Sequence, residues 1–169
     1  MRAARLEAVG RLRVLEREPP VPARGEVLLR VEACGICGTD RHIYRGEYAA
    51  VLPRILGHEF AGTVAAVGEG CRSAVGTRVA VDPNIACGTC ADCRRGEPCL
   101  CPARVALGVD LDGGLAEFAV IPEGQAYRLP DGLPAAWGAL CEPLACCLRA
   151  LDRAEIRPGV RVVVLGGGV

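Results

Sequence analysis

The chain has 169 residues, 51% of them hydrophobic, which suits one globular domain with an ordinary core. Lysine plus arginine equals aspartate plus glutamate at 20 each, and no basic stripe is interleaved with aromatic residues, so nucleic acid is not expected as a partner. The first residues lack the apolar segment of a signal peptide, and no window approaches the roughly 18 apolar residues of a membrane span. We therefore expect a cytoplasmic protein without a membrane partner.

Short β-branched and apolar runs, separated by glycine and proline, fill the first two-thirds of the sequence. The clearest runs cover residues 27–32, 62–67, 78–81 and 116–121. They predict a mainly β, antiparallel and barrel-like domain with a few helices. From residue 133 to about 153 the apolar pattern becomes helical, with Pro134 near the first turn.

The last residues, 159–169, read GVRVVVLGGGV, an apolar strand that runs into glycines. A parallel βαβ dinucleotide-binding (Rossmann) unit begins in this way, and Gly166 and Gly168 are its candidate cofactor-binding residues. The third glycine of the fingerprint would lie beyond Val169. We expect one domain over residues 1–155, followed over residues 156–169 by the truncated first strand and glycine turn of a Rossmann domain.

Eleven cysteines are too many for a cytosolic chain unless something uses them, and metal binding is the best interpretation. The spacing C-x2-C-x2-C-x7-C is formed by Cys87, Cys90, Cys93 and Cys101. Four thiolates fill a tetrahedral Zn²⁺ site, which predicts a structural zinc lobe. An iron–sulfur cluster is the rival, but a ferredoxin run has three residues before its last cysteine instead of seven. Unliganded or redox-active thiols remain a third interpretation, and Cys99 could compete with Cys101.

Both histidines lie in motifs rich in glycine. The first motif, CGICGTDRH, covers residues 34–42, and the second, GHEFAG, covers residues 57–62. A lone histidine is more often a structural residue, but His58 stands beside an acid and between glycines, with a spare cysteine upstream. One thiolate, one imidazole and one or two carboxylates give zinc a mixed site with room for water or substrate, which is typical of a catalytic centre.

These motifs occur in this order and are followed by Glu142-Pro143. Over essentially the whole chain they resemble the zinc-dependent medium-chain alcohol dehydrogenases, most of all the sorbitol (polyol) and threonine dehydrogenase branches. The resemblance implies a GroES-like partial β-barrel with a structural-zinc lobe and two Zn²⁺, one catalytic and one structural. It also implies a full-length homodimer or homotetramer that transfers a hydride from a small secondary alcohol to NAD or NADP.

The resemblance also implies residue roles. The expected ligands of the catalytic zinc are Cys37, His58 and Glu59, with Glu59 able to swing away from direct contact. Thr39 would hydrogen-bond to the substrate oxygen and His42 would relay its proton. Glu142 would lie near the metal, where classical alcohol dehydrogenases have a cysteine ligand.

Simpler interpretations stay open for the last three residues. Thr39 could cap a helix, His42 could be a surface residue, and Glu142 could charge the start of its helix. No ligand role is needed for Cys141, Cys146 and Cys147, and we expect them to pack in the core. Two other functions also stay open, a zinc-stabilised module or scaffold without turnover and a zinc-thiolate redox sensor. Without a nicotinamide pocket, the 169-residue chain is expected to be inactive.

Overall fold

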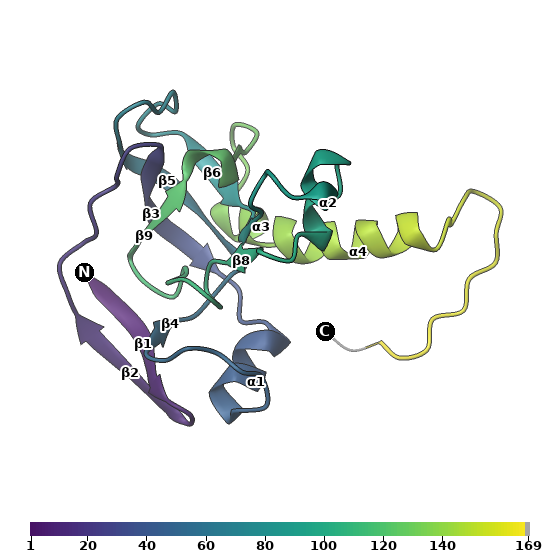
Figure 1. The fold of residues 1–169 in the computed structure, drawn as a ribbon, viewed down its shortest axis with the longest axis horizontal. Helices are drawn as coiled ribbons and strands as arrows, with labels where there is room; N and C mark the ends of the chain where they lie inside the picture. Colours follow the sequence, from purple (N-terminus) through teal and green to yellow (C-terminus); the bar gives the residue numbers. More distant parts are fainter. Residues whose placement is uncertain (168–169) are drawn as a thin grey trace.

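The computed structural model describes residues 1–167 and is built mainly from β-strands (Figure 1). Its largest sheet is antiparallel and has the strand order β10-β6-β5-β3-β9. The strands of this sheet are β3 (Glu26–Cys34), β5 (Phe60–Val67), β6 (Arg78–Val81), β9 (Phe118–Pro122) and β10 (Ala126–Arg128). Two irregularities in the β3–β5 register bend this pair, as bulges do in sheets that curl towards a barrel.

Two smaller sheets flank the large one. A three-stranded sheet has the order β2-β1-β4 and a two-stranded sheet pairs β7 with β8. Their strands are β1 (Arg2–Ala8), β2 (Arg11–Glu16), β4 (Arg54–Ile55), β7 (Asn84–Ile85) and β8 (Val105–Ala106). The helices are α1 (Gly38–Arg45), α2 (Ala91–Arg94), α3 (Ala135–Ala139) and α4 (Cys141–Arg153), with short 3-10 turns at Pro98–Leu100 and Glu123–Gln125. No helix among residues 1–167 is long and apolar enough to cross a membrane.

The main core lies on one face of the large sheet. Along β3, Val27 and Leu29 are fully buried while the intervening residues are less so, as expected for a strand with one face in the core. Phe60 on β5 and Ile121 on β9 belong to the same cluster. Burial of one such side chain contributes about 1.5–3 kcal/mol, so this alternation fixes the register of the strands.

Helix α4 and the tail differ from the prediction. None of the residues of α4 is buried, and Cys141, Cys146 and Cys147 are exposed, so the expectation that they pack in the core is wrong. The helix extends from the body of the molecule in Figure 1, and within residues 1–167 it has few neighbours that could cover these thiols. The exposed residues 157–167 form neither helix nor strand, because an isolated strand has no partner for its hydrogen bonds. The Rossmann unit stays a prediction.

Candidate metal centres

The four cysteines of the predicted lobe come together between β7 and β8. The sulfur atoms of Cys87, Cys90, Cys93 and Cys101 all lie within 4.8 Å of one another. Backbone N–H groups of the same loop donate to these sulfurs, from Cys90 to Cys87 at 3.4 Å and from Cys93 to Cys90 at 3.5 Å. Such donors favour thiolates, which are the form that binds zinc. The fourth member of the group is the buried Cys101, and Cys99 stays outside it.

The cysteine thiols of the lobe differ in pKa. Hydrogen bonds from Thr89, and then from the backbone of Cys90, lower the pKa of the exposed Cys87 thiol to about 6. Partial burial, together with hydrogen bonds to the neighbouring sulfurs, raises the pKa of Cys93 to about 12. The lobe therefore favours the thiolate at Cys87 and the protonated thiol at Cys93, and a bound cation would displace the remaining protons.

The mixed group forms where β3 ends and β5 begins. The strands pair antiparallel with Cys34 opposite Phe60, so the segment after β3 meets the segment before β5. One ligand atom each from Cys37, His58 and Glu59 lies within 4.8 Å of the other two. His58 is buried, with 7% of its surface exposed, while the other two are half-buried. Cys37 and His58, which are 21 residues apart in sequence, thus meet in one place.

Asp40 is a site residue that the sequence analysis missed. Its carboxylate is 4% exposed and accepts the N–H groups of Cys37 at 2.8 Å and Gly57 at 3.0 Å. Its Oδ1 also lies 3.7 Å from Nδ1 of His58, a buried atom without a hydrogen-bond partner among the described residues. Asp40 therefore ties the two motifs together. The sequence did contain a signal, because an acid three residues after the N-cap Cys37 forms a capping box.

Two glycines beside the mixed group have no space for a side chain. Gly57 has φ +91°, and a Cβ there would lie 2.6 Å from Sγ of Cys34. A Cβ on Gly35 would lie 2.2 Å from Oε2 of Glu59. Burial, followed by the charges of Asp40 and Glu59, raises the pKa of Cys34 to about 12. This thiol stays protonated and its sulfur contacts the carbonyl of Gly35 at 3.4 Å, so Cys37 is the thiol of the mixed group.

The predicted proton-handling residues lie on α1. Thr39 Oγ1 is 3.8 Å from Sγ of Cys37, and His42 follows one turn later on the same face of the helix. Because Cys37 is the N-cap of α1, the simpler interpretation of Thr39 as the cap is wrong. His42 is exposed and pairs with Glu47, its Nδ1 lying 2.6 Å from Oε2.

Glu142 lies in the first turn of α4, a third segment of the chain, where the charges of His58 and Glu59 act on its carboxyl group. Burial raises the pKa of its carboxyl group, and the charge of His58 is the first opposing influence. Cys146, one turn further along α4, contacts Oε1 of Glu142 at 3.6 Å. The acid is also in the first turn of its helix, so charging the helix start is compatible with this position. Of the candidate cofactor residues, Gly166 is exposed and Gly168 lies outside the described residues.

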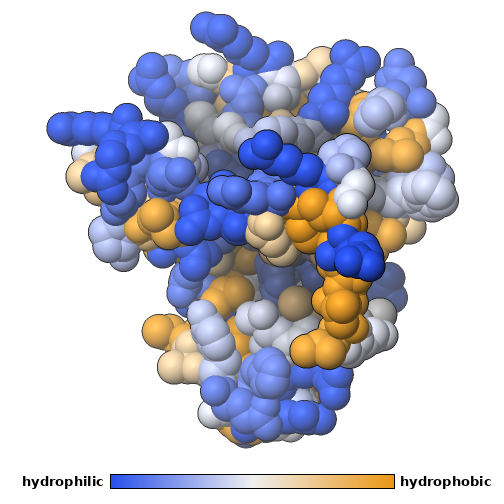
Figure 2. All heavy atoms as spheres, turned by 90° about the vertical axis from the view of Figure 1, so that its right-hand side faces the viewer, coloured by the Kyte–Doolittle hydropathy of each residue, from blue (hydrophilic) through white to orange (hydrophobic). Residues whose placement is uncertain are grey.

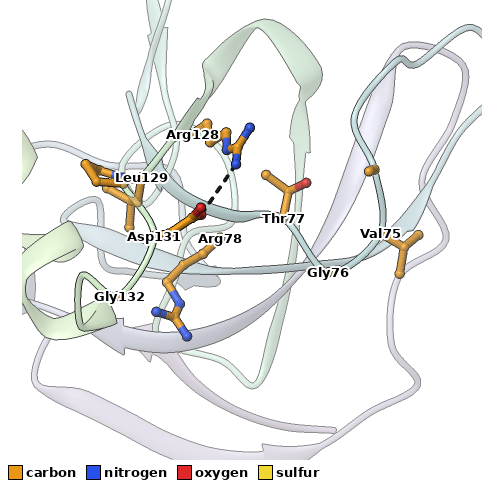
Figure 3. A pocket seen from close by; sticks show the side chains of 10 residues that line it. Val75, Gly76, Thr77, Arg78, Arg128, Leu129, Asp131 and Gly132 are labelled. Atoms are coloured by element: carbon orange, nitrogen blue, oxygen red, sulfur yellow. Dashed lines mark hydrogen bonds and ion pairs between the residues drawn. The ribbon is translucent and has the colours of Figure 1, made fainter.

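Two surface hollows differ in whether predicted site residues line them. The hollow in Figure 3, of about 530 Å³, lies between the loop before β6 and the loop after β10, and Arg128 there pairs with Asp131 at 3.4 Å. It contains none of the predicted site residues. A larger groove of about 800 Å³ follows α4 and is lined partly by Glu142 and Cys146. The face turned to the viewer in Figure 2 is largely hydrophilic, with a band of hydrophobic side chains across it. Leu144 of α4 is one of the exposed large hydrophobic residues.

Comparison with known proteins gives consistent matches. Residues 23–131 match the family model of the alcohol dehydrogenase GroES-like domain. The chain is 41% identical over 170 residues to starvation-sensing protein RspB of Escherichia coli K12, covering 99% of this chain and 50% of that protein. It is 41% identical over 162 residues to L-threonine 3-dehydrogenase of Pyrococcus abyssi, covering 92% of this chain and 46% of that protein.

A solved structure supports the same match. The alcohol dehydrogenase RspB of Escherichia coli CFT073, complexed with NADH, has a TM-score of 0.87 and 42% identity, covering 92% of this chain and 46% of that chain. These matches confirm the expected GroES-like, mainly β fold. The chain spans about half the length of the curated relatives it matches.

Proposed function

This chain belongs to the zinc-dependent medium-chain alcohol dehydrogenase family, as its N-terminal GroES-like domain, and on that premise we propose that it is the catalytic half of a dehydrogenase. The full-length protein oxidises a small secondary alcohol, a polyol or a threonine-like compound, with NAD⁺ or NADP⁺. The observation that carries the proposal is the approach of Cys37, His58 and Glu59, whose ligand atoms lie within 4.8 Å of one another.

The mixed group has the donors that a catalytic zinc requires. A thiol, an imidazole and a carboxylate are all zinc ligands, and three protein ligands leave a position open for substrate. The buried Nδ1 of His58 faces Asp40, so the other ring nitrogen is free for the metal, which is the usual arrangement of a metal-binding histidine. Zinc bound there acts as a Lewis acid that lowers the pKa of an alcohol hydroxyl group.

The residues of α1 handle the proton of the alcohol. The hydroxyl group of Thr39, beside Cys37, accepts the hydroxyl proton of the substrate while its own proton passes to His42. His42 is exposed and delivers the proton to water. The half-buried carboxyl group of Glu142 lies close to this reaction space, as a further ligand or as an acidic neighbour of the substrate.

The hydride is transferred to a nicotinamide nucleotide. The protein supplies binding and orientation for such a cofactor, whose own chemistry carries the hydride. We propose that Gly166 and Gly168 belong to the turn that approaches its pyrophosphate, at the start of a Rossmann domain over residues 156–169. In its full-length form the protein acts as a cytoplasmic homodimer or homotetramer. A single copy of residues 1–169 is expected to lack turnover.

The four-thiol lobe takes the second zinc ion in this proposal. Its sulfurs fill all four positions of a tetrahedral ion, so the ion stabilises the fold and takes no part in the reaction. Two zinc ions per chain follow from the two groups of ligands. An iron–sulfur cluster in the lobe would give strong visible absorption and iron in place of zinc.

The test is the zinc content of the 169-residue chain and of one variant. Wild-type protein refolded with zinc should contain close to two equivalents by elemental analysis, and His58→Ala should contain one. The lobe lacks histidine, so the variant should keep the structural ion. A wild-type chain with a single equivalent that His58→Ala does not change would contradict the catalytic assignment.

An activity assay distinguishes the dehydrogenase from the alternative of a non-enzymatic module. A protein that continues beyond residue 169 with a nucleotide-binding half should reduce NAD⁺ or NADP⁺ with a polyol or with threonine. His58→Ala in that protein should abolish the reaction, because His42, the other histidine of residues 1–167, is not part of the mixed group. A full-length protein that loads both zinc ions but shows no turnover with any secondary alcohol would favour the scaffold.

A further inference from the structure

The end of α1 folds back on His42 through a glycine. Gly46 adopts φ +74°, and its N–H group donates to the carbonyl of Ile43 at 3.0 Å. The next N–H, that of Glu47, donates to the carbonyl of His42 at 2.9 Å. This pairing is typical of a helix that ends in a left-handed residue. The turn therefore brings the side chain of Glu47 back towards the ring of His42.

The position of Gly46 is restricted in two ways. Its positive φ is a backbone conformation that residues other than glycine rarely adopt. A Cβ at this residue would also lie 3.1 Å from both Cγ atoms of Val9. The short run His-x3-Gly-Glu over residues 42–47 thus places the Glu47 carboxylate next to the His42 ring. Contact with Val9 leaves no space for a side chain at residue 46.

Glu47 makes one short contact with the imidazole. Its Oε2 lies 2.6 Å from Nδ1 of His42, and in residues 1–167 it is the acid that pairs with this ring. An ionised carboxylate is an acceptor only, so the proton of this hydrogen bond belongs to Nδ1. When the ring is neutral, Nε2 then has no proton and keeps its lone pair.

We propose that Glu47 is a positioning residue, which holds neutral His42 in the form protonated at Nδ1 and so reserves Nε2 as the atom that receives the relayed proton. The proposal rests on the relay role that the proposed function gives to His42. A ring protonated at Nε2 has no lone pair there and could not accept. In the proposed step Nε2 gains the proton that leaves Thr39, the resulting cation stays paired with Glu47, and Nε2 then releases the proton to water.

The exposure of the pair limits the size of the effect. The side chains of His42 and Glu47 are 58% and 51% exposed, so solvent screens their interaction. The backbone hydrogen bond of Glu47 to His42 offsets part of the entropy that a flexible surface pair would lose. We expect a change in the ratio of the two ring forms on the order of 3- to 5-fold when the carboxylate is removed.

The experiment is ¹⁵N NMR of the imidazole groups in the zinc-loaded 169-residue chain, at a pH of about 9, well above the ordinary imidazole range. The chain has only two histidines, and His42→Gln identifies the signals of His42. Wild-type protein should show Nδ1 as the protonated nitrogen in most molecules. Glu47→Ala should shift the ratio towards Nε2–H, and Glu47→Gln, which keeps a neutral acceptor, should shift it less.

Two further variants separate positioning from general effects. Gly46→Ala keeps the carboxylate but strains the turn, so it should shift the ratio in the same direction as Glu47→Ala. Glu69→Ala removes a similarly exposed acid, which pairs with Arg24, and should change nothing. A wild-type ring protonated mainly at Nε2, or a ratio that Glu47→Ala leaves unchanged, would overturn the proposal.

The measurement needs no turnover, so its failure can be told apart from failure of the proposed function. If the ring form depends on Glu47 but the mixed group takes no zinc, Glu47 does position His42 and the proposed dehydrogenase function fails. If zinc loads as expected but the ring form is independent of Glu47, the dehydrogenase proposal stands without this residue.

Discussion

The two candidate metal centres are built in opposite ways. The lobe brings four sulfurs together within residues 87–101, and backbone N–H groups of the same loop donate to these sulfurs. The mixed group draws Cys37 from the end of one strand and His58 and Glu59 from the start of another. Residue spacing therefore suffices for the first centre, whereas strand pairing and the buried Asp40 assemble the second.

The difference also separates stability from chemistry. A site with four thiols has no open coordination position, and its loop has little regular structure beyond the four residues of α2 and the 3-10 turn at Pro98–Leu100. The mixed site lies on a sheet that the hydrophobic core already holds in place. We therefore expect metal to be needed for folding of the lobe and to be dispensable for folding around the mixed group.

The largest expected effect comes from breaking the lobe. Cys90→Ser should remove one zinc equivalent and lower the melting temperature by roughly 10 °C or more, because a structural zinc contributes directly to folding. Cys37→Ser should also remove one equivalent but leave the melting temperature nearly unchanged. Scanning calorimetry with zinc analysis tests both. The matched control is Cys99→Ser, a neighbouring exposed thiol outside the group. Equal melting of Cys90→Ser and wild type would contradict the structural role.

A smaller effect is expected from Asp40, whose hydrogen bonds hold the two segments of the mixed group together. Asp40→Asn replaces one acceptor oxygen with an NH₂ group and leaves a buried N–H of Cys37 or Gly57 without a partner. The expected cost is about 1–3 kcal/mol in the free energy of unfolding, measured by urea denaturation. Zinc should be lost from the mixed group while the lobe keeps its ion, since partners of ligands commonly change metal affinity by about 10- to 100-fold. Full zinc content in Asp40→Asn would contradict the claim that Asp40 supports the mixed group.

The smallest effect is expected at a similar carboxylate on the surface. Glu123 accepts the N–H groups of Arg72 at 2.7 Å and Ser73 at 2.6 Å, so it has as many backbone donors as Asp40. The bonds to Ser73, followed by that to Arg72, lower its pKa in the folded protein. Its stabilisation is therefore complete above the unfolded pKa of about 4.3 and is lost as the pH falls through the folded value.

Glu123→Gln should lower the melting temperature at pH 7 by no more than about 2 °C, because solvent screens a carboxylate that is only half-buried. The difference from wild type should disappear at low pH, where both side chains are neutral. Melting curves of the two proteins between pH 7 and pH 2.5 test this. A loss as large as that of Asp40→Asn, or a difference independent of pH, would mean that burial does not distinguish the two carboxylates.

Side chains that depend on distant neighbours were the ones that sequence reasoning placed poorly. Asp40 was missed, and its capping-box spacing would have placed it only at the start of a helix, because its second donor, Gly57, lies 17 residues away in sequence. The thiols of α4 were expected in the core because cysteine is often buried, yet burial depends on what packs against the helix. The apolar run near residue 163 is compatible with a strand, but pairing requires a partner that residues 1–167 do not provide.

By itself the sequence determined the strand-rich fold and the membership of the four-cysteine group, because periodicity and ligand spacing act over short distances. The left-handed Gly46 that returns Glu47 to His42 is also largely local, although no motif pointed to it. Only the tertiary structure decided that Cys37 meets His58, that Asp40 joins their segments, and that Glu142 approaches from α4. These contacts depend on the register of β3 against β5 and on the packing of α3 under the sheet, and a one-residue slip of that register would turn the side chains to the opposite face.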